Sequence, residues 1–249
     1  MPLALVTGPT SGIGHSFARA LAMEGHDLVL VSRDEQRLRT VADRLGADHG
    51  ISCEVLTADL SDLEQTKLVE ARLRREPFDV VVNNAGFGME NSFELNGIEA
   101  EQASLDVLVR AVMRLTHAAL GQMMTVGKGD VVNVSSVAAY LPRGTYSAHK
   151  AWVKSFSSWA SVRYGEYGVR VTAVCPGFVR TEFHQRMDAD LSDIPRWMWL
   201  DADDVVSEAL RDLRAGKAVS VPSKRYKALV AAARVTPTRL AERVARRGR

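Results

Sequence analysis

The sequence has few cysteines, few aromatic residues and no long hydrophobic run. Of its 249 residues, two are cysteine and 6% are aromatic, and no apolar stretch approaches the ~18–20 residues of a membrane span. Cys53 and Cys175 lie in apolar, strand-like segments without metal-ligand spacing, so we expect two buried free thiols, no disulfide and no metal site. The amino-terminal segment also lacks the basic flank and long apolar core of a signal peptide. Together these absences favour a cytoplasmic protein.

The charge of the chain is small in total but unevenly distributed. Residues 211–249 carry a net charge of +10 and residues 1–210 carry −8, which gives +2 overall. A basic tail, here about 223–249, can bind an anionic membrane surface or nucleic acid. However, Tyr226, Leu229, Val230 and Ala233 form an apolar stripe at helical spacing. We therefore favour a helix packed on its own domain or on a partner subunit, expect no nucleic-acid partner, and keep membrane contact as a less favoured alternative.

Short apolar strands alternate with helical segments along the chain. This order predicts a single α/β domain, residues 1–249, built on a doubly wound parallel sheet with helices on both faces. The expected strands are 3–7, 27–32, 51–56, 78–82, 130–134 and 169–174, with a short one at 219–221. The expected helices are 13–23, 35–45, one after residue 61, 100–124 and 146–164.

A glycine-rich turn follows the first strand, in Thr7-Gly8-Pro9-Thr10-Ser11-Gly12-Ile13-Gly14. Glycines allow a tight turn and a close approach of backbone to a pyrophosphate, and the helix that follows supplies amide donors. A plain turn is the alternative, but the position between strand and helix favours a dinucleotide cofactor. The candidate contacts are Gly8, Thr10, Ser11, Gly12, Ile13 and Gly14.

The second strand ends at Ser32-Arg33. An acidic residue at this strand end binds the ribose 2′-hydroxyl of NAD, whereas a nearby arginine accommodates a 2′-phosphate. Because Ser32 replaces the acid and Arg33 supplies a guanidinium, we favour NADP(H) over NAD(H). The alternative is that Arg33 is a solvated arginine at a helix start.

Polar residues also follow the third and fourth strands. Asp59-Leu60 could accept from an adenine amino group, although helix capping is the alternative, a role that Ser61 could also fill. Asn84-Ala85-Gly86 would let the cofactor lie close to the backbone, although a plain turn would use the same residue types.

Tyr146 and Lys150 are four residues apart, which puts both side chains on one face of a helix. An ammonium beside a phenol favours the phenolate and lowers its pKa from about 10. Such a tyrosine can transfer a proton near neutral pH. The spacing is common by chance, so its meaning depends on Ser135-Ser136 shortly before it and on the other motifs.

In this order, the motifs Thr-Gly-x-x-x-Gly-x-Gly, Asn-Asn-Ala-Gly, Asn-Val-Ser-Ser, Tyr-x-x-x-Lys and Pro-Gly resemble the compact branch of the short-chain dehydrogenase/reductase family. The resemblance extends from Leu3 to about Thr181. It implies a Rossmann-like fold and hydride transfer between a nicotinamide cofactor and a small-molecule carbonyl or secondary alcohol. It also implies a homodimer or homotetramer.

Carried over by position, the resemblance implies that Ser136 polarises the substrate oxygen and Tyr146 is the general acid/base. Lys150 lowers the pKa of the tyrosine and binds the nicotinamide ribose. In the segment 175–181, Val179 would bind the carboxamide through its backbone and Thr181 would lie near the amide or phosphates. Pro176 and Gly177 complete this expected nicotinamide contact, and Tyr146 is also counted among the cofactor-binding residues.

Two departures from the family pattern stand out. Leu108 occupies the position of an asparagine that usually holds a water between the lysine and solvent, and Asp106 faces elsewhere on a helix. Leucine cannot hydrogen-bond, so a nucleotide-sensing or regulatory protein with little catalysis is our alternative function. The Ser–Tyr interval, 137–145, is also short, which should reshape one wall of the substrate site.

The variable segment of about 180–200, which we call the substrate lid, is rich in aromatic residues and methionine. This composition favours an apolar or bulky substrate, with packing or a subunit contact as an equal alternative. The residues concerned are Phe183, His184, Met187, Ile194, Trp197, Met198 and Trp199. Trp152 and Trp159 form a separate stripe on the Tyr146 helix, which we interpret as core or oligomer interface.

Overall fold

The computed structural model describes residues 1–89, 91–182 and 194–235. Its centre is a seven-stranded parallel sheet in the order β3-β2-β1-β4-β5-β6-β7. The strands are β1 Leu3–Thr7, β2 Asp27–Ser32, β3 Cys53–Thr57, β4 Val80–Asn83, β5 Gly129–Val134, β6 Val169–Val174 and β7 Val219–Ser220. Strand order reverses between β1 and β4, so a ligand crevice is expected at their carboxyl ends.

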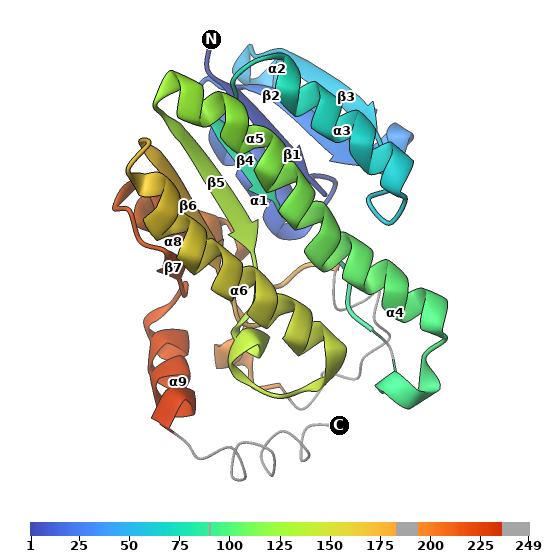
Figure 1. Cartoon of the computed structure of the whole chain (residues 1–249), viewed down its shortest axis with the longest axis vertical. Coiled ribbons are helices and arrows are strands. Elements are labelled where there is room, and N and C mark those ends of the chain that lie inside the picture. The colour runs from blue at the N-terminus through green and yellow to red at the C-terminus, as the bar shows by residue number, and fades with distance from the viewer. Residues whose placement is uncertain (90, 183–193, 236–249) are drawn as a thin grey trace.

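Helices cover both faces of this sheet (Figure 1). The helices are α1 Gly12–Met23, α2 Glu35–His49, α3 Leu63–Arg75, α4 Ile98–Leu105, α5 Val112–Val126, α6 Gly144–Gly165, α8 Ala202–Arg214 and α9 Lys224–Val235. Shorter helical turns are η1 Phe93–Leu95, η3 Val137–Tyr140 and η4 Arg196–Met198. The expected fold, a doubly wound single domain, is confirmed.

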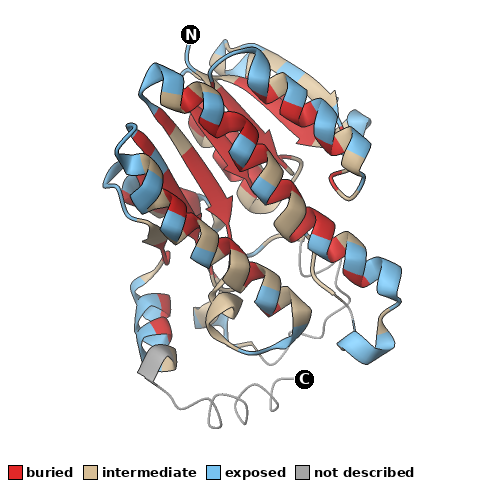
Figure 2. Ribbon diagram, viewed as in Figure 1, coloured by how far each residue is buried: buried red, intermediate tan, exposed pale blue. Residues whose placement is uncertain are grey.

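Two apolar layers form the core, one on each face of the sheet. Phe17, Leu38 and Leu213 bring α1, α2 and α8 onto one face, whereas Leu73, Leu115 and Ala160 bring α3, α5 and α6 onto the other. The central strands between them are buried on both sides (Figure 2), because helices that cover both faces of a parallel sheet exclude water from its strands.

The structure changes three details of the expected elements. β3 and β4 begin two residues later than predicted, and α2 extends to His49, after which Gly50 ends it with a left-handed φ of 68°. The long helix is not one regular α-helix, since a π-helical segment, Asp106–Ala111, separates α4 from α5. Apolar periodicity has no signal for such an insertion. Cys175 is buried as expected, but Cys53 is only partly so, and both are free thiols.

The described part of the basic tail packs on its own domain. In α9, Tyr226 and Val230 are buried, whereas Leu229 is exposed, so the predicted apolar stripe is narrower than expected. Residues 236–249 of the tail and 183–193 of the lid lie outside the described residues. Within the described residues, no helix combines the length and the apolar character needed to cross a membrane.

Candidate active site

The conformation of the glycine turn depends on the backbone angles of Gly8 and Gly12 and on a close contact at Gly14. Gly8 and Gly12 have φ angles of 67° and 56°, in the left-handed region that favours glycine. At Gly14, any Cβ would overlap the carbonyl oxygen of Gly8 and the amide of Asn84. The turn therefore forms a tight cradle at the start of α1, where the amide donors of a helix N-terminus suit a pyrophosphate.

Thr7 and Asn84 hold this turn against the end of β4. The hydroxyl of Thr7 accepts hydrogen bonds from the backbone N–H groups of Asn84 and Ala85, both at 2.9 Å. The side-chain amide of Asn84 donates to the carbonyls of Thr7 and Gly8 at 3.0 and 3.1 Å. Asn84 thus shapes the cradle, and Thr7, which sequence reasoning did not select, does so equally. Its only sequence signal is a hydroxyl at the strand end.

Ser32 and Arg33 present hydrogen-bond donors at the end of β2. The hydroxyl of Ser32 is buried and has no partner among the described residues, and the Arg33 side chain is 69% exposed. Arg33 lies 3.7 Å from a carboxylate oxygen of Asp59, a loose pair that a stronger anion can replace. A hydroxyl and a guanidinium in this arrangement suit a phosphate group.

Asp59 and Leu60 have local roles in addition to the cofactor contact expected of them. The Asp59 carboxylate accepts hydrogen bonds from the backbone and hydroxyl of Ser61 at 2.9 and 2.7 Å. The side chain of Leu60 is buried in the core, so only its backbone can face a ligand. Neither Asp59 nor Ser61 caps α3, because Asp62 accepts from the first N–H groups of that helix.

Arg37 is a further residue at the cradle that sequence reasoning missed. Its guanidinium donates to the carbonyl of Thr10 at 3.1 Å and to Glu182 at 2.9 Å. The side chain of Thr181 packs on the same turn, since a Cβ added to Gly12 would lie 2.7 Å from its methyl carbon. The cradle is therefore covered on one side by Thr181 and Glu182, at the start of the substrate lid. In the sequence, the only indication that Arg37 could lie at the cradle is its position four residues after Arg33.

Ser136 and Tyr146 meet at the carboxyl edge of β5. A side-chain hydrogen bond joins them, and Tyr146 lies half-buried in the first turn of α6. Burial raises the pKa of Tyr146 to about 12, although the hydrogen bond with Ser136 lowers it. The sequence predicted a lowered pKa, and the structure has the opposite direction. The reason is that the cost of desolvating a phenolate exceeds the stabilisation from neighbouring groups.

Lys150 lies one turn further along α6 and is buried. Its ammonium is 5.7 Å from the centre of the Tyr146 ring and donates to the carbonyl of Val134 at 2.8 Å. Burial lowers its pKa to about 8. The hydroxyl of Ser135 donates a hydrogen bond of 2.7 Å to the carbonyl of Lys150, so Ser135 ties the end of β5 to α6.

Leu108 reaches the same place from the π-helical segment. A Cβ added to Gly86 would lie 2.8 Å from a methyl carbon of Leu108 and 3.9 Å from the ammonium of Lys150. Leu108 is 1% exposed, so an apolar side chain closes this side of the lysine. Asp106 points elsewhere, as expected, and pairs with Arg110 at 2.8 Å.

The segment 176–181 runs past the tip of β5. The carbonyl of Pro176 accepts from the N–H of Val137 at 3.0 Å. Val179 pairs with Leu200 in a parallel bridge, in which Phe178 and Arg180 make the two backbone hydrogen bonds. Because backbone groups alternate along an extended chain, the N–H and C=O of Val179 point away from Leu200.

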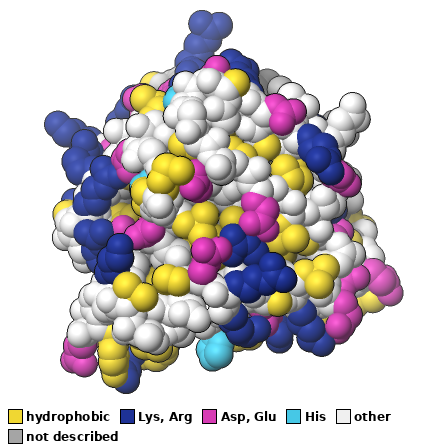
Figure 3. Space-filling model, turned by 90° about the horizontal axis from the view of Figure 1, so that it is seen from above, with side chains coloured by type: hydrophobic (Ala, Val, Ile, Leu, Met, Phe, Trp, Pro, Cys, Tyr) yellow, Lys and Arg dark blue, Asp and Glu magenta, His cyan; other side chains and the backbone are white. Residues whose placement is uncertain are grey.

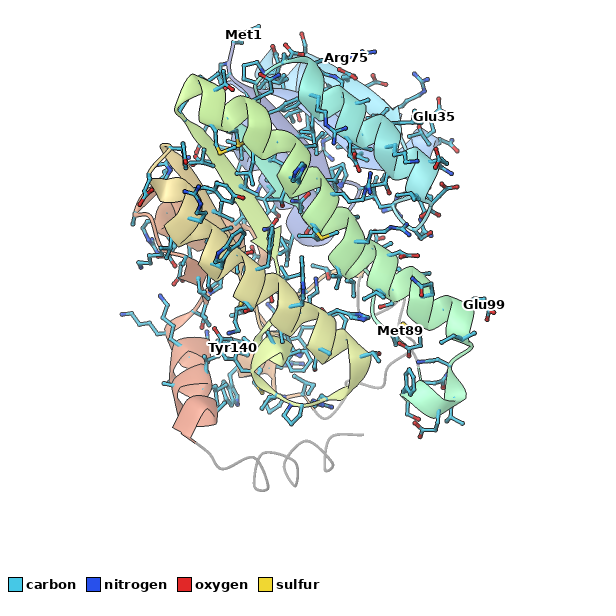
Figure 4. The ribbon with its side chains drawn as sticks, viewed as in Figure 1. Met1, Glu35, Arg75, Met89, Glu99 and Tyr140 are labelled. Carbon is cyan, nitrogen blue, oxygen red and sulfur yellow. The ribbon has the colours of Figure 1, made fainter. Side chains whose placement is uncertain are left out.

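Apolar side chains frame the end of the molecule at which the strands finish. Tyr140 lies beside α6 on one side, and Met89 lies near α4 on the other (Figure 4). Exposed side chains in this region include Phe93, Leu95 and Ile98, exposed by 58, 71 and 66%, and Trp197, exposed by 53%. Phe183, His184 and Met187 of the lid lie outside the described residues.

An aromatic stripe runs along the outer face of α6. Trp152 stacks on Phe156 with ring centres 4.9 Å apart, Phe156 contacts Trp159, and Trp159 meets Tyr164 edge-on. Trp159 and Val162 are exposed by 55 and 79%. The stripe therefore lies on the surface, which removes the core interpretation of Trp159. Within the described ranges, no group of three or more His, Cys, Asp or Glu side chains forms a metal-binding cluster.

Comparisons with known proteins agree with this architecture. The family model for short chain dehydrogenase matches residues 2–192. An uncharacterized oxidoreductase of Staphylococcus saprophyticus is 33% identical over 229 residues, which are 88% of this chain and 94% of that protein.

Two solved structures are similar over nearly the whole chain. A short-chain dehydrogenase from Sphingobium yanoikuyae in complex with NADPH has 33% identity, a TM-score of 0.86 and 94% coverage of both chains. The bulky-bulky ketone specific alcohol dehydrogenase from Comamonas testosteroni has 30% identity and a TM-score of 0.81, with 94% of this chain and 92% of that one covered. The chain therefore belongs to the short-chain dehydrogenase family of oxidoreductases, whose members bind nicotinamide cofactors.

Proposed function

We propose that the protein is an NADPH-dependent carbonyl reductase. The observation that carries the proposal is the meeting of Ser136, Tyr146 and Lys150 beside Gly86, at the edge of the sheet that also bears the glycine cradle. Bound NADPH would supply a hydride to the carbonyl carbon. The residues of this chain would bind and orient the substrate and provide the proton that completes the alcohol.

The pKa values of the site favour reduction. At neutral pH, Tyr146 with a pKa of about 12 holds its proton, so its hydroxyl can donate to the carbonyl oxygen together with that of Ser136. When Tyr146 gives up this proton, the Lys150 ammonium stabilises the phenolate and can return a proton to it. A lysine with a pKa of about 8 is mostly charged at pH 7 yet releases its proton readily.

Oxidation of NADPH by a panel of aryl and alkyl ketones tests this function. We expect turnover with bulky ketones, and a loss of about 10²–10⁴-fold in Tyr146→Phe, with NADPH binding largely retained. Tyr167→Phe is the matched control, because this tyrosine is partly exposed and its hydroxyl accepts a hydrogen bond from Arg163. Retained turnover in Tyr146→Phe would reject the assignment.

The choice of NADPH rests on Ser32 and Arg33. The relative in complex with NADPH supports it. We expect Arg33→Ala to weaken NADPH binding by about tenfold or more and to leave NADH binding nearly unchanged, because only NADPH carries the 2′-phosphate. Arg39→Ala on α2, the helix that follows Arg33, is the control, since Arg39 pairs with Glu35 at 2.6 Å. Equal losses for both cofactors would reject the preference.

The proposed substrate is an apolar, bulky ketone. The exposed apolar residues of η1, α4 and η4 lie at the end of the molecule where the strands finish (Figure 1), which is the end at which the reaction would occur. The ketone specificity printed for the Comamonas testosteroni relative supports the same class. Ketones with small substituents should therefore have a higher KM than aryl ketones.

We also propose that two copies associate through the aromatic stripe of α6. Association would cover Trp159 and Val162, which are exposed in the single chain. Trp159→Glu should shift the protein to a lower mass in sedimentation, whereas Trp197→Glu should not. A dimer that survives Trp159→Glu places the interface elsewhere.

A second function, nucleotide sensing with little catalysis, is favoured by one observation. Buried Leu108 closes the side of Lys150 where a polar contact to solvent would be useful. Tight NADPH binding with no turnover across the ketone panel would support the sensor and reject the reductase.

A further inference from the structure

Helix α9 lies beyond the residues matched by the family model, which ends at residue 192, and no step proposed above uses it. Nevertheless, α9 contacts the segment 176–181. The contact is made by Tyr226, which is 3% exposed although it belongs to a helix of mostly exposed residues. A buried polar side chain on a mostly exposed helix indicates a specific role for its hydroxyl.

The Tyr226 hydroxyl joins two segments that are far apart in sequence. It accepts a hydrogen bond from the backbone N–H of Phe178 at 3.0 Å and donates one to the carbonyl of Met198 at 2.8 Å. Burial raises the pKa of Tyr226, although the hydrogen bond from Phe178 lowers it. The phenol therefore remains protonated at neutral pH and can make both bonds at once.

The ring of Tyr226 packs closely on Gly177. A Cβ at Gly177 would overlap the ring carbons, so this glycine is required by the tyrosine and not by its own backbone angles, since its φ lies outside the left-handed region. Arg225 adds a hydrogen bond to the carbonyl of Trp197. Together, these contacts let α9 fix the segment at Gly177 and Phe178 and the η4 turn at Trp197 and Met198.

Val179 lies directly between these fixed points. Its two neighbours bond to Leu200, and the hydroxyl of Tyr226 holds the N–H of Phe178. The bonds with Leu200 fix the peptide groups on both sides of Val179, and the bond with Tyr226 fixes the peptide group before them, between Gly177 and Phe178. The N–H and C=O of Val179 are therefore held in one orientation. That orientation points them away from Leu200.

We propose that Tyr226 is a positioning residue that holds the 177–179 backbone in the orientation needed to bind the nicotinamide end of the cofactor. The proposal rests on the proposed function, because it requires that this segment contact nicotinamide. Tyr226 touches neither cofactor nor substrate. It acts through Phe178 and Gly177.

The test compares the two ends of the cofactor. NADPH contains both the nicotinamide and the 2′-phosphorylated adenosine, whereas 2′,5′-ADP contains only the latter. In Tyr226→Phe, calorimetric titration should give a Kd for NADPH about tenfold higher than that of the wild type, a loss of one hydrogen-bonded contact. The Kd for 2′,5′-ADP should stay within about twofold. Tyr167→Phe should change neither value.

Each outcome decides between the explanations. An equal loss for NADPH and 2′,5′-ADP, or no loss for either, overturns the role of Tyr226. If the wild-type protein binds neither compound, the proposed function fails instead. This failure is seen in the wild-type protein alone, so it cannot be confused with a failure of the role of Tyr226.

A second measurement does not need any cofactor. Amide hydrogen exchange followed by NMR should show the Phe178 N–H exchanging at least about tenfold faster in Tyr226→Phe, because its acceptor is gone. The Ser135 N–H, which donates to the carbonyl of Val174 at 2.7 Å, is the internal control and should not change. Unchanged exchange at Phe178 would show that Tyr226 does not hold this backbone and would overturn the proposal.

Discussion

The two edges of the parallel sheet treat their ionisable side chains differently: ion pairs stabilise charged forms at the amino edge, and burial favours neutral forms at the carboxyl edge. At the amino edge, Asp79 pairs with Lys128 at 2.8 Å and Asp130 pairs with Arg170 at 2.6 Å. The surface at this end mixes acidic, basic and hydrophobic side chains (Figure 3). At the carboxyl edge, burial shifts the pKa values of Tyr146 and Lys150 so that the neutral form of each is favoured.

The difference shows which ionisable side chains keep their charge near neutral pH and which can gain or lose a proton there. For Asp79, burial raises the pKa, but hydrogen bonds from Lys128 and from the N–H of Leu3 outweigh it, so the pKa is lowered. For Lys150, no carboxylate opposes burial among the causes of its shift. Substitutions at the amino edge should therefore change stability, and those at the carboxyl edge should change binding and turnover.

The largest effect should come from Gly14→Ala at the carboxyl edge. The new methyl group would overlap the carbonyl of Gly8 and the amide of Asn84, so the cradle must open or the chain must shift. We expect NADPH binding to fall by at least about 100-fold, equivalent to about 2.7 kcal/mol, as measured by calorimetry.

Gly121→Ala provides the contrast. Gly121 is an exposed glycine inside α5 with open space around its Cα, so alanine should stabilise the protein by about 0.5–1 kcal/mol and leave NADPH binding unchanged. A cradle that tolerates Gly14→Ala with normal affinity would remove the distinction between the two edges.

The next effect is a pH dependence set by Lys150. Because its pKa is about 8 and not that of an ordinary lysine, ketone reduction should fall about tenfold per pH unit above pH 8. The same shift affects stability. The unfolded chain binds more protons between pH 8 and about 10.4, so the contribution of Lys150 to stability should rise with pH in that window.

Initial rates from about pH 6 to 10 measure the first effect, and urea unfolding at the same pH values measures the second. Lys150→Met should remove its part of the rise in stability. A rate that stays level across this range would contradict the lowered pKa of Lys150.

A smaller effect should follow from Leu108→Asn. An amide next to Lys150 could hold a water and open a path for proton exchange, so we expect a severalfold rise in turnover near neutral pH. Leu105→Asn, one turn earlier on the more exposed side of the helix, should leave turnover unchanged. If Leu108→Asn lowers turnover without loss of folded protein, apolar closure of this side is itself required.

The smallest effect should come from Asp79→Asn at the amino edge. Loss of the carboxylate weakens its bonds with Lys128 and Leu3, and we expect Tm to fall by about 2–4 °C with NADPH binding and turnover unchanged. Because the folded pKa of Asp79 is lowered, its contribution is present above the unfolded pKa and is lost as pH falls through the folded pKa. The difference in Tm between variant and wild type should therefore shrink in acid.

The sequence predicted the parallel sheet and the shared helix face of Tyr146 and Lys150 because both depend on local patterns. Short apolar strands reveal a buried parallel sheet, and a spacing of four residues is helical. It could not predict contacts between distant segments, such as Arg37 with Glu182 or Tyr226 with Phe178. Nor could it predict the pKa of Tyr146, which depends on how much water the fold excludes.

In the π-helical segment Asp106–Ala111, the number of residues matters as much as their identity, because it sets how α4 is rotated relative to α5. A π segment accommodates an added residue within a helix, and successive residues of an α-helix are turned by about 100°. Deleting one residue between 106 and 111 should restore a regular helix and rotate all of α4 by that angle relative to α5. The surface that α4 turns toward α6 would then be a different one, although no side chain of α4 had been replaced.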